Sequence, residues 1–120
     1  NYFKTGLENF KENDGTAGSN VIENLSDIAP DLARYIIEFA FGQIYERPGL
    51  SLQERELLTL SSLLTAGGCE AQLQVHINAA LHVGIKEEKI IEAFLHCIPY
   101  TGFPKVLNAV AVAGQIFSGK

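Results

Sequence analysis

The chain has 120 residues, a length at which one domain can bury an adequate hydrophobic core, so a second domain is not expected. Hydrophobic residues make up 47% of the chain and charged residues 19%, a composition that excludes a disordered protein. The net charge is −5 and the basic residues are scattered, so the positive surface that binds nucleic acid is missing.

Membrane, metal and disulfide classes are also disfavoured. No apolar run reaches the roughly 18 residues that span a bilayer, because Glu38, Asn108 and Gln115 interrupt the longest ones. The first residues lack the basic-then-apolar pattern of a secretion signal, so the expected location is the cytoplasm. Cys69 and Cys97 are too few for a disulfide framework or a structural metal site, and we expect reduced thiols and no metal.

The start of the chain predicts a short helix and a linker. Apolar residues recur at helical spacing over residues 1–13, whereas Asp14–Asn20 is rich in residues that break helices. We therefore expect a mobile N-terminal helix and linker over residues 1–26 and a helical domain over residues 27–120.

Five further helices are expected, each delimited by residues that start or end helices. Ser51 and Glu54 form a capping box, in which each side chain accepts from the other residue's backbone N–H. Gly84 suits a left-handed helix cap, and Pro99 should bend or end the helix before it. These helices cover residues 27–47, 51–66, 69–82 and 86–97, and a last one begins near Pro104. Since no alternating β-branched run occurs, the predicted fold class is all-α, a single-domain bundle of about six helices.

His76 is the first candidate for chemistry. It lies in the middle of a largely apolar helix, and its imidazole can give and take protons near neutral pH. A histidine in such a place is more often a hydrogen-bonded core residue than a catalyst. On the residues alone, both interpretations stay open.

Cys69 is the second candidate. It precedes His76 by seven residues and Gln72 precedes it by four, so all three lie on one helix face. Cys69 is still roughly 10 Å from His76 along the helix axis, too far for a direct thiolate–imidazole pair. It is either a small buried hydrophobic residue or a reactive thiol at a helix start.

Other charged residues have local explanations. Glu56 enters a leucine-rich helix and is either solvated or needs a partner where its surface packs. Arg34 stands four residues before Glu38 and either pairs with it or anchors an anionic ligand. His82 and His96 are taken as structural. No glycine-rich phosphate loop follows a strand, so no cofactor is expected.

Four motifs follow one another along the chain: Ala29-Pro30-Asp31-Leu32-Ala33-Arg34, Arg55-Glu56-Leu57-Leu58-Thr59-Leu60, Gln72-Leu73-Gln74-Val75-His76 and Tyr100-Thr101-Gly102-Phe103-Pro104. In this order they resemble the carboxymuconolactone decarboxylase family, over about Asp27 to Phe117. The family includes decarboxylases of protocatechuate breakdown and, more distantly, alkylhydroperoxidase D peroxidases. The resemblance implies an all-helical protein that assembles as a homohexamer, a trimer of dimers. Unusually apolar helix faces and an alanine-rich last helix also favour a homo-oligomer.

The two branches of the family differ at one position. In the peroxidase branch the resemblance implies a glutamate at Glu56, a first cysteine at Cys69, a second at the position of Gln72 and a histidine at His76. Gln72 can neither attack a peroxide nor close a disulfide with Cys69. The sequence therefore resembles the decarboxylase branch better. A thiol-dependent peroxidase using Cys69 alone and a non-catalytic oligomeric binding protein are the alternatives.

The decarboxylase branch implies cofactor-independent loss of carbon dioxide from 4-carboxymuconolactone, a carboxylated lactone of aromatic catabolism. The electrons left behind delocalise into the lactone carbonyl, so the enzyme must stabilise an enolate and deliver a proton to carbon. We assign proton delivery to His76 and the orientation of its ring to Glu56. Arg34 and Arg55 are the candidate anchors for the substrate carboxylates, and Tyr100 a candidate for the pocket wall.

Overall fold

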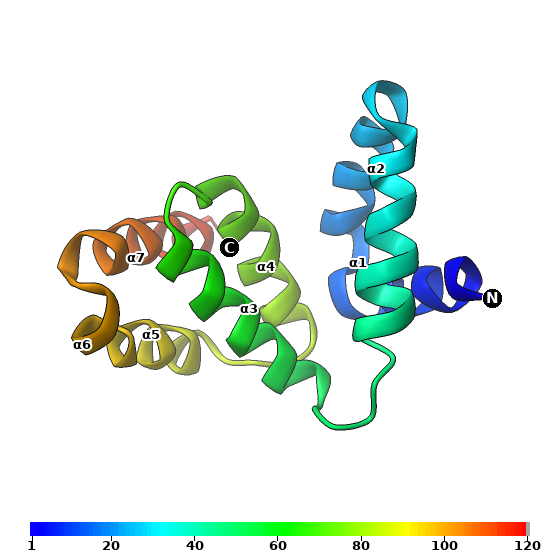
Figure 1. The fold of residues 1–120 in the computed structure, drawn as a ribbon. Coiled ribbons are helices and arrows are strands. Elements are labelled where there is room, and N and C mark those ends of the chain that lie inside the picture. Colours follow the sequence, from blue (N-terminus) through cyan, green and yellow to red (C-terminus); the bar gives the residue numbers. More distant parts are fainter. Residues whose placement is uncertain (120) are drawn as a thin grey trace.

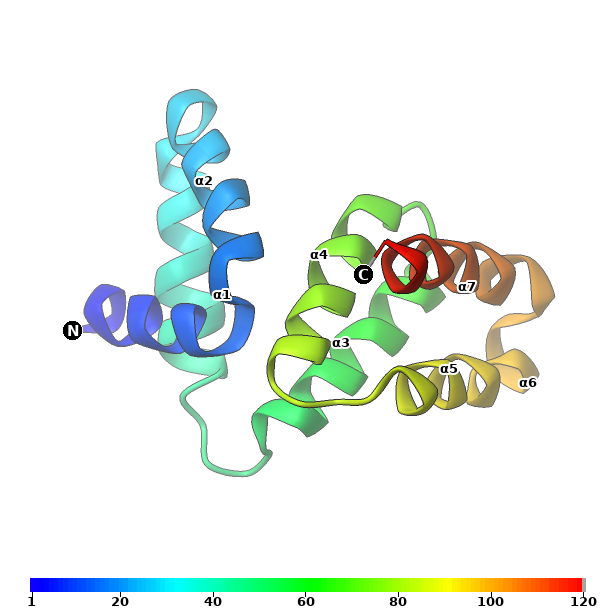
Figure 2. The same ribbon diagram turned by 180° about the vertical axis from the view of Figure 1, so that it is seen from behind.

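The computed structural model describes residues 1–119, apart from the side chains of Thr16 and Ala17, and this part of the chain is helical with no strand (Figures 1 and 2). Its elements are α1 (Tyr2–Ile28), α2 (Pro30–Tyr35), η1 (Ile36–Ile44), α3 (Leu52–Ala66), α4 (Glu70–His82), α5 (Glu87–His96), α6 (Ile98–Thr101) and α7 (Phe103–Ser118). The predicted all-α fold is confirmed. Because α2 and η1 form one continuous helix, the described residues hold seven helices, and the short α6 after Cys97 is the one not expected. None of these helices is both long and apolar enough to cross a membrane.

The segment Asp14–Asn20, expected to be a linker, is helical. Only Gly15 leaves the helical region, with φ 62° and ψ −143°. Glycine adopts this conformation at little cost because it has no Cβ, so α1 bends at Gly15 and continues. The first half of α1 then lies across the end of η1, and the second half runs beside α2 (Figure 2).

Helices α1 and η1 cross at two glycines. A Cβ on Gly6 would lie 1.8 Å from the carbonyl oxygen of Ile37, and a Cβ on Gly42 would lie 2.3 Å from the carbonyl oxygen of Tyr2. The two backbones therefore touch, which a larger residue at either position would prevent. Beside this crossing is a small core of Phe10, Ile37 and Phe41.

η1 is π-helical. Its turns are wider than those of an α-helix, and after the last one the N–H of Tyr45 donates to the carbonyl of Ala40, five residues earlier, at 2.8 Å. Such turns are uncommon and often lie near functional sites. Here the last turn leads directly to Tyr45, whose hydroxyl reaches α3.

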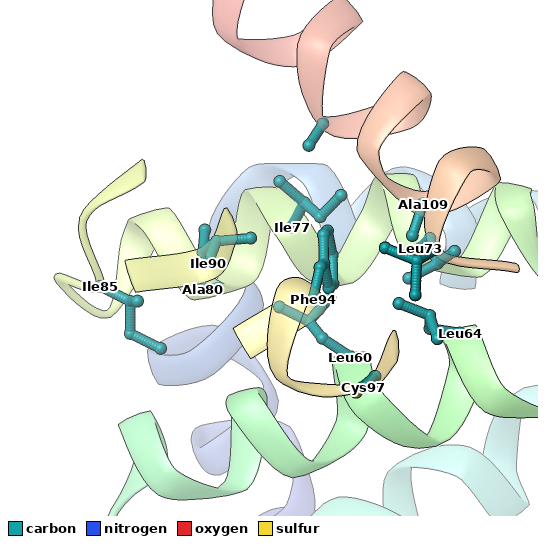
Figure 3. Packing of buried hydrophobic residues seen from close by; sticks show 12 residues of the cluster. Leu60, Leu64, Leu73, Ile77, Ala80, Ile85, Ile90, Phe94, Cys97 and Ala109 are labelled. Carbon is teal, nitrogen blue, oxygen red and sulfur yellow. The ribbon is translucent and has the colours of Figure 1, made fainter. Parts of the chain in front are cut away.

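The larger core lies among α3, α4, α5 and α7, and Figure 3 shows its side chains gathered around Phe94. Its buried members are Leu60, Leu64, Leu73, Ile77, Ala80, Ile85, Ile90, Phe94, Cys97, Val106, Ala109 and Ala113. Burial of such apolar surface is the main force that holds the bundle together. The packing sets α3 against α4, which places Glu56 of α3 next to His76 of α4.

The predicted helix ends are confirmed where local chemistry specifies them. The Ser51 N–H donates to Glu54 Oε1 at 2.9 Å, and the Glu54 N–H donates to Ser51 Oγ at 3.1 Å, which completes the capping box. Gly84 has φ 94° after α4, and the next N–H, of Ile85, donates back to Ala80 at 3.0 Å.

Candidate active site

His76 and Glu56 form a pair between α4 and α3. Nδ1 of His76 lies 2.9 Å from Oε1 of Glu56. The Glu56 side chain is fully buried, and that of His76 is 21% exposed. A buried carboxylate requires a partner, because its desolvation is otherwise uncompensated. The structure thus brings together His76, to which sequence analysis assigned proton delivery, and Glu56, to which it assigned the orientation of the imidazole ring.

This pairing favours the protonated form of His76. Burial by itself lowers the pKa of His76, because it disfavours the imidazolium. The hydrogen bond and negative charge of Glu56 are the main influences that oppose burial, and the pKa of His76 is raised. With Nδ1 facing Glu56, Nε2 is the nitrogen from which a proton can be given to another molecule.

The second oxygen of Glu56 has two further donors. Oε2 accepts from Nδ2 of Asn13 at 3.0 Å and from the hydroxyl of Tyr45 at 2.8 Å. Burial, together with the nearby charge of Glu56, raises the pKa of Tyr45, so its hydroxyl stays protonated and donates. Sequence analysis missed both donors, because Asn13 and Tyr45 lie 43 and 11 residues from Glu56 and no local spacing marks them.

Asp14, the residue after Asn13, is a second buried carboxyl group at the site. Its Oδ1 accepts from Nδ2 of Asn13, the same amide group that contacts Glu56. Burial raises the pKa of Asp14, and the hydrogen bond from Asn13 and the charge of His76 only partly oppose this. Sequence analysis placed Asp14 in the linker and assigned it no role.

A cavity of about 380 Å³ adjoins His76. It lies between α1, the α2–η1 helix and α4, and its volume is within the range of small-molecule sites. Its polar residues are Asp14, Gln72 and His76. The rest of the wall is formed by Phe10, Gly18, Val21, Ile22, Leu25, Leu32, Ile36, Phe41 and Val75. The imidazole therefore stands at the edge of a largely apolar space that can hold a small molecule.

The two arginines predicted as anchors lie outside the cavity wall. Arg34 has a half-exposed side chain and pairs with Asp31 at 3.5 Å and Glu38 at 3.4 Å, so of its two alternatives the pairing with Glu38 is the one the structure shows. Arg55 donates from Nη2 to the carbonyl of Arg47 at 2.7 Å. Arg55 also lines a separate hollow, on the α3 surface near Tyr45.

Cys69 and Tyr100 also lie outside this wall. Cys69 precedes the first turn of α4, and its thiol donates to the carbonyl of Gly67 at 3.4 Å. Tyr100, on α6, is 78% exposed and lies near His96. Within residues 1–119 no group of three histidine, cysteine, aspartate or glutamate side chains is arranged to hold a metal ion.

Comparison with known proteins gives two named relatives. Over 116 residues the chain is 35% identical to 4-carboxymuconolactone decarboxylase of Acinetobacter baylyi, an alignment that covers 96% of this chain and 86% of the relative. Over 109 residues it is 34% identical to nitrosuccinic acid decarboxylase of Metarhizium robertsii, covering 88% and 76%. An uncharacterized 15.0 kDa protein of Paracoccus denitrificans is 25% identical over 95 residues, covering 78% and 71%. Residues 30–115 match the carboxymuconolactone decarboxylase family, and the chain therefore belongs to that family.

Proposed function

We propose that this chain is a decarboxylase that removes carbon dioxide from a small carboxylated compound, with His76 as the proton donor. One observation carries the proposal. The imidazole, hydrogen-bonded to the buried Glu56 at 2.9 Å, lines a cavity large enough for a small molecule.

The names of the relatives point to one type of chemistry. The substrate named for one is a carboxylated lactone, and the substrate named for the other is a diacid with a nitro group. In each compound an electron-accepting group, the lactone carbonyl or the nitro group, can take up the electron pair that remains when carbon dioxide leaves. The reaction then requires no electron sink from the protein, only a stabilised anion and a proton.

The residues at the cavity can supply the proton that the carbon needs after carbon dioxide has left. The bond between the substrate carbon and its carboxylate breaks, carbon dioxide leaves, and the electron pair passes into the acceptor group. Nε2 of the His76 imidazolium then gives its proton to carbon, forming the C–H bond of the product. His76 becomes neutral, remains hydrogen-bonded to Glu56 and regains a proton from solvent before the next cycle.

For the substrate we propose 4-carboxymuconolactone, and with it a place in aromatic catabolism. The identity of 35% over most of both chains supports this choice over nitrosuccinic acid only slightly, because the second relative is 34% identical. The largely apolar cavity wall also suits a ring. The two substrates are therefore best compared directly.

We also propose that the chain forms a homo-oligomer, and a hexamer in particular. Large apolar side chains are exposed at the start of α7 and beside it, where Tyr100, Phe103 and Leu107 are 78%, 65% and 64% exposed. Such clustered apolar surface is typical of protein interfaces. Light scattering on the purified protein tests this, and a mass equal to one chain would exclude it.

The activity is tested by incubating the purified chain with 4-carboxymuconolactone or with nitrosuccinate while following ultraviolet absorbance and carbon dioxide release. We expect release from at least one of them. His76→Gln, which keeps a polar side chain without a titratable group, should abolish release while circular dichroism still shows a folded helical protein. Full activity in this variant would rule out His76 as the proton donor.

A further inference from the structure

The cavity wall includes a carboxyl group, that of Asp14, which the reaction described above does not use. Asp14 lies on α1 just before the bend at Gly15, is buried, and lines the cavity together with His76. We propose that Asp14 acts in its protonated form, donating a hydrogen bond to the substrate oxygen that gains charge as carbon dioxide leaves. This inference rests on the proposed decarboxylase function and extends it to the N-terminal helix.

Asn13 holds the two carboxyl groups of the site in place. Its Nδ2 donates both to Oε2 of Glu56, at 3.0 Å, and to Oδ1 of Asp14. Glu56 has two more partners, His76 and Tyr45, which complete the environment of an ionised carboxylate. For Asp14 the structure shows one side-chain donor, Asn13. Two carboxyl groups so differently surrounded are suited to different roles.

Gly18, one helical turn after Asp14, leaves the Asp14 carboxyl accessible to the cavity. A Cβ at this position would lie 2.7 Å from Oδ2 of Asp14 and 2.6 Å from the ring of Phe10. Any side chain at residue 18 would therefore cover that oxygen. All three residues line the cavity, and Oδ1 of Asp14 already accepts from Asn13, so we propose Oδ2 as the oxygen that meets a bound molecule.

Burial favours the neutral form of Asp14, whereas the charged groups around it act in both directions. Those that face it are Glu56 on α3, His76 and His82 on α4, and the phenol of Tyr45 after η1. Burial is the main influence on Asp14 and raises its pKa, as does the charge of Glu56, whereas the two histidines and Asn13 oppose them.

A neutral Asp14 also suits the substrate. No lysine or arginine is among the described residues that line the cavity, so an ionised Asp14 would repel a substrate carboxylate there with only the His76 imidazolium to compensate. A protonated Asp14 can instead donate to the oxygen on which charge develops. Such a donor binds the transition state more strongly than the ground state, and its effect is seen mainly in kcat.

Two substitutions of Asp14 test whether its carboxyl group acts as a protonated hydrogen-bond donor. Asp14→Asn keeps a neutral donor of the same shape, whereas Asp14→Leu has the same size and no donor. We expect Asp14→Leu to lower kcat by about 10²–10³-fold, the effect of losing one oxyanion donor, with little change in KM. Asp14→Asn should retain most of the activity. Its kcat should also fall less than that of the wild type at high pH, because asparagine cannot ionise. The matched control is Asp27→Asn, an exposed position on the same helix.

The opposite results overturn the proposal. If Asp14→Asn is as inactive as Asp14→Leu, the carboxyl acts in its ionised form. If Asp14→Leu is folded and has the kcat of the wild type, the group has no role in the reaction.

A binding measurement keeps this inference separate from the proposed function. Propionate 3-nitronate carries one negative charge on its carboxylate and one on its nitro oxygens, so it imitates the electron-rich intermediate. Because His76 would protonate its carbon, every protein used for binding also carries His76→Gln. Isothermal titration calorimetry should show weaker binding when Asp14→Leu is added than when Asp14→Asn is added, and binding to His76→Gln alone that weakens as pH rises through the Asp14 titration. If the wild type releases no carbon dioxide but this binding pattern is found, the proposed function fails and the role of Asp14 as a donor to an anion stands. If the wild type is active but His76→Gln does not bind the nitronate, or the two Asp14 variants bind it equally, the role of Asp14 fails alone.

Discussion

Asn13 of α1 donates to Glu56 of α3 at 3.0 Å, across 43 residues of sequence, and so connects the N-terminal helix to the His76 site. Both side chains are fully buried. Replacing Asn13 with alanine leaves Glu56 with one donor fewer in a place that water cannot easily reach. We expect Asn13→Ala to lower the free energy of unfolding by about 1–3 kcal/mol, measured by urea denaturation. Asn20→Ala, at an exposed position on the same helix, is the control and should have little effect.

Glu56→Gln tests whether the carboxylate sets the protonation of His76. The substitution removes the negative charge that raises the pKa of His76, and burial then lowers it. We expect kcat at neutral pH to fall, by up to about 10²–10⁴-fold if general-acid catalysis is lost entirely. Histidine NMR titration should show a lower pKa for His76. Glu54→Gln is the matched control on the same helix, because glutamine can still complete the capping box. An unchanged His76 titration in Glu56→Gln would contradict this account.

The same pair predicts how stability depends on pH. The folded protein holds the His76 proton more tightly than the unfolded chain, because the pKa of His76 is raised in the fold. This stabilisation is complete below the pKa of an unfolded histidine, about 6.5, and is lost as pH rises through the folded value. The free energy of unfolding should therefore decline over that interval in the wild type and decline less in His76→Gln. Parallel curves for the two proteins would show that the pair does not contribute.

Cys69→Ser distinguishes a decarboxylase from a thiol peroxidase. Cys69 is outside the described wall of the cavity and its thiol donates to the carbonyl of Gly67, a bond that a serine hydroxyl can also make, so serine should leave decarboxylation nearly unchanged. A peroxidase would lose its nucleophile and all turnover of peroxide. The measurement is carbon dioxide release and peroxide consumption by both proteins, in the presence of a dithiol reductant.

Gly6→Ala tests the helix crossing that holds the N-terminal half together. The added methyl group would lie 1.8 Å from the carbonyl oxygen of Ile37, so α1 and η1 must separate. Overpacking of this kind costs about 1–3 kcal/mol, which thermal unfolding can detect. Gly49→Ala is the control, because a Cβ at that position meets nothing within 4 Å. Equal melting temperatures for the two variants would show that the crossing is less tight than described.

The features predicted correctly from the sequence were those set by near neighbours. The Ser51–Glu54 capping box and the Gly84 cap depend on atoms a few residues apart, so their signals are visible in the sequence itself. The residues Glu56 and His76 were connected by resemblance to a family, because 20 residues separate them and no spacing rule relates two different helices.

The segment around Gly15 shows where local reasoning fails. Its composition is typical of a linker, yet one bend at Gly15 lets the helix continue and pack against η1 and α4. Tertiary packing outweighs weak helix propensity in such cases. The error concealed Asn13 and Asp14, whose roles depend on contacts with α3 and α4. Arg34 shows the limit of spacing rules. Its distance of four residues from Glu38 allowed their pairing to be anticipated, but it could not show that Arg34 lies outside the cavity wall.

The cavity lies between two separately packed cores. Glu56 and His76 belong to helices of the larger core, whereas most of the wall comes from α1, α2 and η1, which share the smaller one. In the proposed reaction, proton transfer and the choice of substrate are thus carried by different halves of the chain. Descendants of this sequence could accept a differently shaped acid through substitutions in the N-terminal half alone, while the imidazole and its carboxylate remain untouched.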